Sequence, residues 1–313
     1  MSIWEVDFYR RPLQTEAGVP LWELVVCVLP GDRVYTATCP QPEATAAWIQ
    51  AQLQVLLTDG HSPPERMLVF RPQALSVLTA ACQELGIAVQ ATRRTPTLKQ
   101  ALVELAQQYP TRSQYTGAAY DPLKLEQAPP VPLDESLLGH QWQFAALPAG
   151  ELVEAFAGRM IPIVEMPPEL HPDRLGLAGS LPIPGVVIEG GRRSLRLATW
   201  IQQAQPVALT AFSGPPGGLV LEAGLSDRWI MATFDDPGVL TAATVYEQRK
   251  QASQGLHFLL VQPDDSGMTY SGFWLLQGGA SMRWPQVARG DRALIRLAPQ
   301  SLSGVDLGFA ALY

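Results

Sequence analysis

The first 110 residues show strand and helix patterns in a fixed order, and this order limits the folds that the chain can adopt. Residues 3–9 alternate apolar and polar side chains, so a strand there would bury Trp4 and Phe8 and leave its other face in water. The apolar run from Leu21 to Leu29 ends at a Pro-Gly-Asp turn signal, and residues 33–38 show a third strand pattern. Three antiparallel strands are therefore expected to open the chain.

Helix and strand patterns alternate in the rest of this region. Apolar side chains recur at helical spacing over three segments, and two short apolar strand patterns lie between them. In chain order these segments are 41–58 (helix), 67–70 (strand), 72–85 (helix), 87–91 (strand) and 96–109 (helix). The resulting order, βββαβαβα, is that of the ribonuclease H-like fold. The sequence therefore predicts an N-terminal α/β domain of this type over residues 1–110.

A proline-rich stretch separates this domain from a second patterned region. Residues 111–139 contain turn signals and several prolines, which predict an inter-domain linker. Strand and helix patterns then resume, including a helix over 194–205 and a later helix that Asp236 would cap. We expect a mixed α/β domain over residues 140–280 and a weakly patterned C-terminal extension over 281–313. The predicted fold class is thus α/β (α+β) with two domains.

The composition is that of a folded, slightly acidic protein. Hydrophobic residues make up 47% and charged residues 16% of the chain, and the net charge is -7, which excludes a disordered basic arm. Positive charge comes from 19 Arg and 3 Lys, so most of it lies on planar groups that stack on rings and bind phosphate in bidentate fashion. The longest uncharged stretch, 197–221, contains Gln, Pro and Gly, so no membrane span is expected. Acidic residues near the N-terminus do not suit a signal peptide, and a cytoplasmic location is expected.

Sequence motifs of the common enzyme and cofactor classes are absent. The three cysteines and four histidines form no CxxC, HxxxH or HExxH pattern, so neither a disulfide scaffold nor a metal site is indicated. No two glycines are spaced as GxG, so the sequence has no dinucleotide-binding fingerprint. No lysine follows a glycine, so it has no phosphate-binding P-loop either. No serine lies in a GxSxG pattern. We therefore expect no cofactor, no metal and no enzymatic activity of these types.

A divergent metal-dependent nuclease remains as an alternative. The ribonuclease H-like order of elements suggests this alternative. Two-metal hydrolysis uses carboxylates that converge from several elements. Asp7, with Glu5 or Glu23, lies on the first predicted strands, but the strand pattern at 66–70 has no carboxylate. A solvated or structural role is the simpler interpretation of Asp7 and Glu5.

Arginines and aromatic residues occur close together in both predicted domains. Aromatic rings stack on unpaired bases and guanidinium groups hold phosphate, so the combination suits single-stranded RNA. The alternative is that tryptophans such as Trp4, Trp48 and Trp200 lie in the core and that the arginines lie on an ordinary solvated surface. The candidate RNA-binding residues are Tyr9, Arg10, Arg11, Trp22, Arg192, Arg193, Arg196, Arg228, Trp229, Lys250, His257 and Trp274.

Several of these segments resemble the Tab/Atab-type family of RNA-binding proteins from cyanobacteria and chloroplasts. The similar segments include WEVDFYRRP at 4–12, IPGVVI at 183–188, LATWI at 197–201 and GFWLL at 272–276, and they follow the family order over residues 2–277. The resemblance implies binding to A/U-rich leader sequence and activation of photosystem message translation, as in plant and algal members. It assigns no catalytic residue.

These observations predict a non-enzymatic factor that binds single-stranded, A/U-rich mRNA leader and supports translation or biogenesis of photosystem subunits. A second hypothesis is a protein-interaction scaffold that engages translation machinery or photosystem assembly proteins through its proline-rich surface. The divergent nuclease is the third. Because the chain is acidic overall, RNA binding requires a local concentration of arginines, which we expect at residues 10–11 and 192–196.

Overall fold

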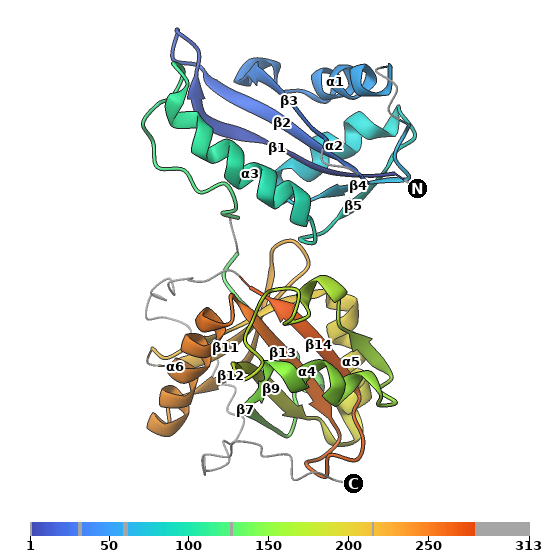
Figure 1. Ribbon diagram of the computed structural model, residues 1–313, viewed down its shortest axis with the longest axis vertical. Helices are drawn as coiled ribbons and strands as arrows, with labels where there is room; N and C mark the ends of the chain where they lie inside the picture. Colours follow the sequence, from blue (N-terminus) through green and yellow to red (C-terminus); the bar gives the residue numbers. More distant parts are fainter. Residues whose placement is uncertain (1, 31–32, 59–61, 126–127, 215, 279–313) are drawn as a thin grey trace. The chain divides into compact units, whose positions relative to one another are not determined.

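The protein folds into two compact units. The computed structural model describes residues 2–30, 33–58, 62–125, 128–214 and 216–278. The N-terminal unit comprises the residues up to Gln127 together with 224–226, and the C-terminal unit comprises Ala128–Ala223 and the described residues from Asp227 onward. Each unit combines helices with strands (Figure 1), so the predicted two-domain α/β class is confirmed.

The N-terminal unit is built on one five-stranded mixed sheet with the strand order β3-β2-β1-β4-β5. β1, β2 and β3 are antiparallel neighbours, and β4 and β5 extend the sheet parallel to β1. The elements are β1 (Ile3–Gln14), β2 (Pro20–Leu29), β3 (Arg33–Pro40), α1 (Ala46–Thr58), β4 (Arg66–Val69), α2 (Pro72–Gln83), β5 (Ala88–Ala91) and α3 (Pro96–Gln108). This is the predicted βββαβαβα order. Membership of the ribonuclease H-like fold stays a prediction that depends on this order.

Helices cover both faces of this sheet. On one face, α1 and α2 pack against the apolar side of β1, where Trp4 and Phe8 are buried. On the other face, α3 packs against β2 around Val25. The prediction that this second face of β1 is in water is wrong, because Glu5 and Asp7 are 2% and 0% exposed beneath α3 and the chain that follows it.

The predicted linker at 111–139 is divided between the two units. Tyrosines from residues 109–120 pack against Leu13 and Leu21 of the N-terminal sheet. Residues 131–137 belong to the C-terminal unit, in which they form a short strand and bury two leucines. Residues 126–127, between these segments, lie outside the described residues. Most of the predicted linker is therefore part of one unit or the other.

The C-terminal unit contains two sheets, with the orders β10-β11-β12-β6 and β7-β9-β13-β14-β8. Its strands are β6 (Val131–Pro132), β7 (Gln141–Pro148), β8 (Ile163–Glu165), β9 (Pro182–Glu189), β10 (Pro206–Phe212), β11 (Gly217–Ala223), β12 (Asp227–Phe234), β13 (Leu256–Gln262) and β14 (Gly272–Gln277). Its α-helices are α4 (Ala149–Ala157), α5 (Ser194–Ala204) and α6 (Pro237–Ala252). One buried apolar cluster joins residues of both sheets with α5 and α6.

Short 3₁₀ turns connect several of these elements. They are η1 (Gln41–Glu43), η2 (Tyr109–Thr111), η3 (Glu135–Leu137), η4 (Pro168–Leu170) and η5 (Gly191–Arg193).

Local sequence signals explain where the C-terminal helices begin. The Asp236 carboxylate accepts a hydrogen bond from the Val239 amide at 3.0 Å, and Pro237 occupies the first turn of α6, as predicted. α5 follows the glycine pair Gly190-Gly191 and covers the predicted helix apart from its last residue. The predicted extension at 281–313 lies outside the described residues.

Candidate nucleic-acid interface

The twelve predicted RNA-contact residues differ sharply in their exposure. The first group is exposed to solvent, the second is half-buried and the third is buried. The exposed residues are Arg10, Arg192, Arg193 and Arg196; the half-buried residues are Tyr9, Trp22 and Trp229; the buried residues are Arg11, Arg228, Lys250, His257 and Trp274. Five of the twelve therefore lie where RNA in solution does not reach them.

Arg11 lies inside the N-terminal unit and is fully occupied by protein partners. Its guanidinium group donates to Asp7 and Glu23, each at 3.1 Å, and to the Tyr120 hydroxyl at 2.7 Å. Burial opposes its charge, but Asp7 and the neighbouring tyrosines hold the pKa of Arg11 above its ordinary value. The sequence pattern missed this role because Arg11 stands directly beside the exposed Arg10.

A second buried arginine, Arg71, was not singled out from the sequence. Its Nε donates to Asp7 at 3.0 Å, and its two terminal nitrogens donate to the backbone carbonyls of Pro122 and Lys124, both at 2.9 Å. Its guanidinium group also lies 4.2 Å from the centre of the Tyr9 ring. Arg71 therefore binds the segment after α3 to the sheet and occupies a face of a predicted RNA-stacking ring.

These buried contacts remove the support for a metal-dependent nuclease at Asp7. Asp7 bridges Arg11 and Arg71, and Glu23 accepts hydrogen bonds from Arg11 and Tyr109. Glu5 accepts a hydrogen bond from the Leu98 amide at 2.7 Å, while burial raises its pKa. Within the part of the chain that the structure describes, no group of three or more His, Cys, Asp or Glu side chains could hold a metal ion. Asp7 and Glu23 neutralise arginines instead of forming an open cation site.

Lys250 and His257 belong to a buried hydrogen-bond network on the outer edge of β10. The Leu209 amide donates to His257 Nε2 at 2.8 Å, and the Leu209 carbonyl accepts from Lys250 Nζ at 2.8 Å. Glu247 accepts from the Ala211 amide at 2.7 Å. Burial, with the positive charge of Lys250, lowers the pKa of His257 to about 3. These side chains satisfy strand backbone groups, so the structure gives them a structural role.

The two remaining buried candidates also have protein partners. Trp274 is 0% exposed, and its indole Nε1 donates to the Gln202 side chain at 2.7 Å. Arg228 is 7% exposed, and it donates to the Ala128 carbonyl at 3.4 Å. Both side chains are therefore buried within the C-terminal unit.

Three exposed arginines of the C-terminal unit lie close together at the beginning of α5. Arg192 and Arg193 form the 3₁₀ turn η5, and Arg196 follows in the first turn of the helix. Gly191 adopts a φ of +53°, and a Cβ at Gly190 would lie 2.6 Å from the backbone of the first helical residue. The glycine pair thus allows a tight turn directly into the helix, which places three arginines within one short stretch.

Two tryptophans adjoin these arginines. Trp200 lies four residues after Arg196, so both side chains project from the same side of α5. Trp229 of β12 packs against Trp200, with 5.4 Å between ring centroids and an interplanar angle of 83°. Both rings are half-buried. We refer to Arg192, Arg193, Arg196, Trp200 and Trp229 as the α5 surface. The spacing of Arg196 and Trp200 was the available signal that Trp200 is not purely a core residue.

The charge of the α5 surface is largely uncompensated. Positive charge at a helix N-terminus is electrostatically unfavourable because it opposes the helix dipole, and the first turn of α5 contains no acidic residue. No described carboxylate lies within salt-bridge distance of the three arginines, although Arg196 contributes to lowering the pKa of Asp134. Exposed cations beside partly exposed indole rings form a surface suited to an anionic, base-bearing polymer.

The two halves of the chain match two family models. The model described as RNA-binding protein Tab2/Atab2 N terminal matches residues 3–105, and that described as RNA-binding protein Tab2/Atab2, C-terminal domain matches residues 120–277. The chain belongs to the Tab2/Atab2 family of RNA-binding proteins. The predicted family resemblance is thereby confirmed, and it supports an RNA-binding role for the protein.

Curated relatives of this Tab2/Atab2 family member come from plants. The protein named "Protein TAB2 homolog, chloroplastic" from Arabidopsis thaliana is 31% identical over 278 residues, which cover 87% of this chain and 74% of the relative. The protein of the same name from Zea mays is 32% identical over 281 residues, which cover 87% of this chain and 70% of the relative.

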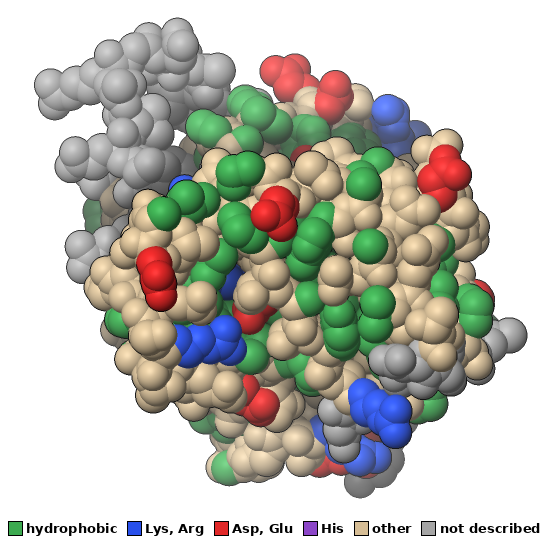
Figure 2. Space-filling view, turned by 90° about the horizontal axis from the view of Figure 1, so that it is seen from above, with side chains coloured by type: hydrophobic (Ala, Val, Ile, Leu, Met, Phe, Trp, Pro, Cys, Tyr) green, Lys and Arg blue, Asp and Glu red, His purple; other side chains and the backbone are tan. Residues whose placement is uncertain are grey.

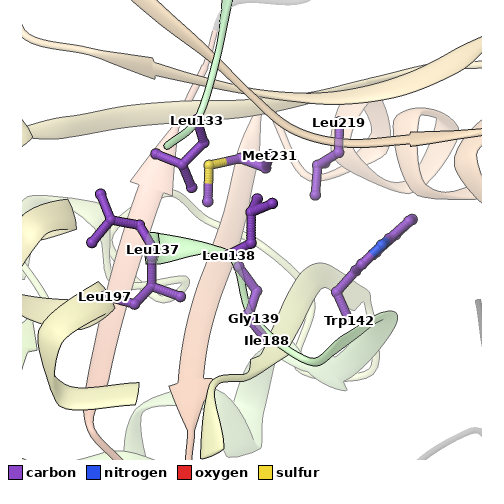
Figure 3. A pocket seen from close by; sticks show the side chains of 9 residues that line it. All are labelled: Leu133, Leu137, Leu138, Gly139, Trp142, Ile188, Leu197, Leu219 and Met231. Carbon is purple, nitrogen blue, oxygen red and sulfur yellow. The ribbon is translucent and has the colours of Figure 1, made fainter. Parts of the chain in front are cut away.

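An apolar cavity in this Tab2/Atab2 family member does not resemble a ligand site. Figure 3 shows side chains from both ends of the segment between β6 and β7 turned toward Met231 and Leu219. The cavity volume is about 10 Å³, near the minimum for one water molecule. The lining residues are Leu133, Leu137, Leu138, Gly139, Trp142, Ile188, Leu197, Leu219 and Met231. It is a small packing gap in the core.

None of the helices among the described residues is long and apolar enough to span a membrane.

Proposed function

We propose that this Tab2/Atab2-family protein is a non-enzymatic RNA-binding factor whose α5 surface contacts single-stranded RNA. The observation that carries the proposal is the clustering of three exposed arginines beside two half-buried tryptophans, in a protein whose other candidate cations are largely internal. Arginines supply phosphate contacts and indole rings supply stacking on unpaired bases. The same proposal includes an A/U-rich mRNA leader as target, a role in photosystem subunit translation and a cytoplasmic location, which follow from the sequence expectations.

Equilibrium binding with charge-reversal variants tests this proposal. Fluorescence anisotropy would measure the affinity of the full chain for a labelled A/U-rich single strand at about 50 and 200 mM salt. The variant R192E/R193E/R196E should weaken binding at least about tenfold, because repulsion replaces three phosphate contacts.

A matched control keeps the same change in total charge. Arg33 of β3, Arg66 of β4 and Arg174 in the turn after η4 are exposed and lie outside α5, so R33E/R66E/R174E should weaken binding by less than about threefold. Equal losses in the two triple variants would show a general charge effect and would overturn the α5 assignment. A G/C-rich single strand and an A/U-rich duplex test base preference and strandedness separately.

The scaffold alternative would use a proline-rich surface as its binding face. Residues 109–125 pack on the N-terminal unit through Arg11 and Arg71, but Pro110, Pro129 and Pro132 are exposed, so the scaffold stays a second candidate function. A pull-down with and without ribonuclease distinguishes the two functions. Partners that persist after digestion support a scaffold, and partners that disappear support RNA binding.

A further inference from the structure

The outer face of α1 and α2 is unusual because it carries no charge. None of the 13 residues of α1 or the 12 residues of α2 is Asp, Glu, Lys, Arg or His. The other four α-helices in the described part of the chain all contain charged residues; α3, for example, carries Lys99 and Glu104. Surfaces of designed soluble proteins are given about 25–35% charged residues. The two helices therefore form a distinct region of the surface.

This charge-free face is exposed to solvent in the described structure. α1 and α2 contact each other on the same side of the sheet, and their inner side chains form the core with Trp4 and Phe8. Outward, α1 presents Ala47, Ala51 and Val55, the last of which is 44% exposed. The remaining exposed positions are neutral, namely Gln54 and Thr58 of α1 and Gln73, Ser76, Thr79, Ala80 and Gln83 of α2.

Figure 2 shows the molecule from the top of Figure 1, the side on which α1 lies. Hydrophobic and other uncharged side chains cover much of this view, with Lys, Arg, Asp and Glu side chains scattered among them. Depletion of charged residues is the compositional signature of an interface core.

We propose that the face formed by α1 and α2 associates with the same face of a second copy of this chain. A two-fold symmetric interface brings one surface against itself, so a charged residue near the axis meets its own like charge. A neutral face avoids this repulsion, and this matters for a chain with a net charge of -7. Exposed glutamine, serine and threonine side chains both donate and accept hydrogen bonds, so each can pair with its symmetry mate.

Other occupants fit this face less well. Nucleic acid and strongly charged peptides require charged partners, which neither helix provides. A membrane surface favours a basic polar face and large exposed apolar side chains, whereas this face combines alanine and valine with glutamine, serine and threonine. The area of the face formed by α1 and α2 also limits how strongly two copies of the chain can associate.

The size of the face predicts a weak, concentration-dependent dimer. A 13-residue helix is about 20 Å long, and two packed helices span about 20 Å across, which gives about 400 Å² per copy. That is half the roughly 800 Å² per partner of a standard stable interface. We expect a dissociation constant of about 10–100 µM.

Sedimentation velocity on the nuclease-treated full chain, from about 1 to 200 µM, tests the inference. The wild type should convert from monomer to dimer over this range. A51E/V55E places two like charges on the exposed side of α1 and should weaken association at least about tenfold. The matched control is V103E/Q107E on α3, where Val103 is 38% exposed and the spacing is the same; it should leave association unchanged.

Two further measurements keep the test decisive. A51K/V55K alone should remain monomeric, but an equal mixture with A51E/V55E should restore the dimer, because opposite charges then meet across the axis. Since Cys27, Cys39 and Cys82 are all buried, A51C offers a single accessible thiol and should form a disulfide-linked dimer on mild oxidation, whereas V103C should not. A wild type that stays monomeric, association that requires RNA, or equal effects of the α1 and α3 variants would each overturn the proposal.

Discussion

The two arginine clusters of this protein show opposite uses of the same side chain. In the N-terminal unit, Arg11 and Arg71 are buried and bound to Asp7. In the C-terminal unit, the three arginines at the start of α5 are exposed. The difference follows from the carboxylates that surround them. Asp7 and Glu23 share the α3-covered side of the N-terminal sheet, whereas α5 has no acidic residue in its first turn.

This difference indicates how a buried and an exposed arginine contribute to the protein. A buried guanidinium group pays a large desolvation cost and is tolerated only when its donors are satisfied. An exposed one contributes little to stability and remains available for phosphate. Substitutions in the first cluster should therefore affect folding, and substitutions in the second should affect RNA binding.

The largest effect is expected from Arg71→Met. This change leaves Asp7 with one cationic partner and removes the donors to the Pro122 and Lys124 carbonyls. The loss should destabilise the N-terminal unit by about 3–5 kcal/mol. Hydrogen exchange of the β1 amides would measure it. Arg192→Met should change the stability of the C-terminal unit, measured by hydrogen exchange of its own amides, by less than about 0.5 kcal/mol, and similar costs for both variants would remove the distinction between the clusters.

The buried network of the C-terminal unit should appear in the pH dependence of stability. Folded His257 stays neutral until the pH falls to about 3, whereas the unfolded residue takes up its proton near pH 6.5. The stabilising contribution is therefore complete above about pH 6.5 and declines by about 1.4 kcal/mol per pH unit below it. At pH 5 the expected loss is about 2 kcal/mol.

His257→Gln isolates this contribution. Hydrogen exchange of the C-terminal unit at pH 7.5 and 5.0 would measure how its free energy of unfolding depends on pH. The variant should be less stable than the wild type at pH 7.5, but it should lack the further loss of stability that His257 causes between these two pH values. RNA affinity at pH 7.5 should change by less than about twofold, because the side chain is fully buried. An unaltered slope in the variant would refute the assignment of this pH dependence to His257.

The salt dependence of RNA binding should distinguish the phosphate contacts of the α5 surface from its stacking contacts. Arg193→Ala should lower the slope of log affinity against log salt by about 0.7, as expected for one phosphate contact with a single strand. Trp200→Leu retains apolar packing against Trp229 but removes the indole ring, so it should weaken binding by about 1 kcal/mol with the slope unchanged. If both variants alter the slope alike, Trp200 does not act by stacking.

Local patterns were sufficient to predict the order of elements but not the environment of the arginines. Strand alternation and helical spacing are properties of a few consecutive residues, and they gave the βββαβαβα order and the cap at Asp236. The burial of Arg11 depends on Glu23 and Tyr120, which are 12 and 109 residues away. His257 similarly bonds to Leu209, 48 residues distant. Such partners become neighbours only in the folded chain.

The exposed cluster was easier to recognise because its arrangement is local. A glycine pair, two arginines and a helix that places Arg196 one turn before Trp200 lie within eleven consecutive residues of the sequence. The half-buried state of Trp200 depends on Trp229, which comes from strand β12. The local sequence pattern around Trp200 could not predict this contact. Candidate contact residues are thus recognised most easily where one segment supplies most of them.

The smallest effect on stability and on RNA affinity is expected from a substitution of Arg10. This prediction tests whether the difference between buried and exposed arginines also holds for two adjacent residues, Arg10 and Arg11. Side chains alternate along β1, so Arg10 is exposed while Arg11 faces Asp7 and Glu23. Arg10→Glu should change stability by less than about 0.5 kcal/mol and RNA affinity by less than about threefold, because the other arginine of β1, Arg11, is buried. Hydrogen exchange and anisotropy would measure the two effects. A loss of affinity as large as that of R192E/R193E/R196E would instead place an RNA contact on the N-terminal unit, and α5 would then be only part of the interface.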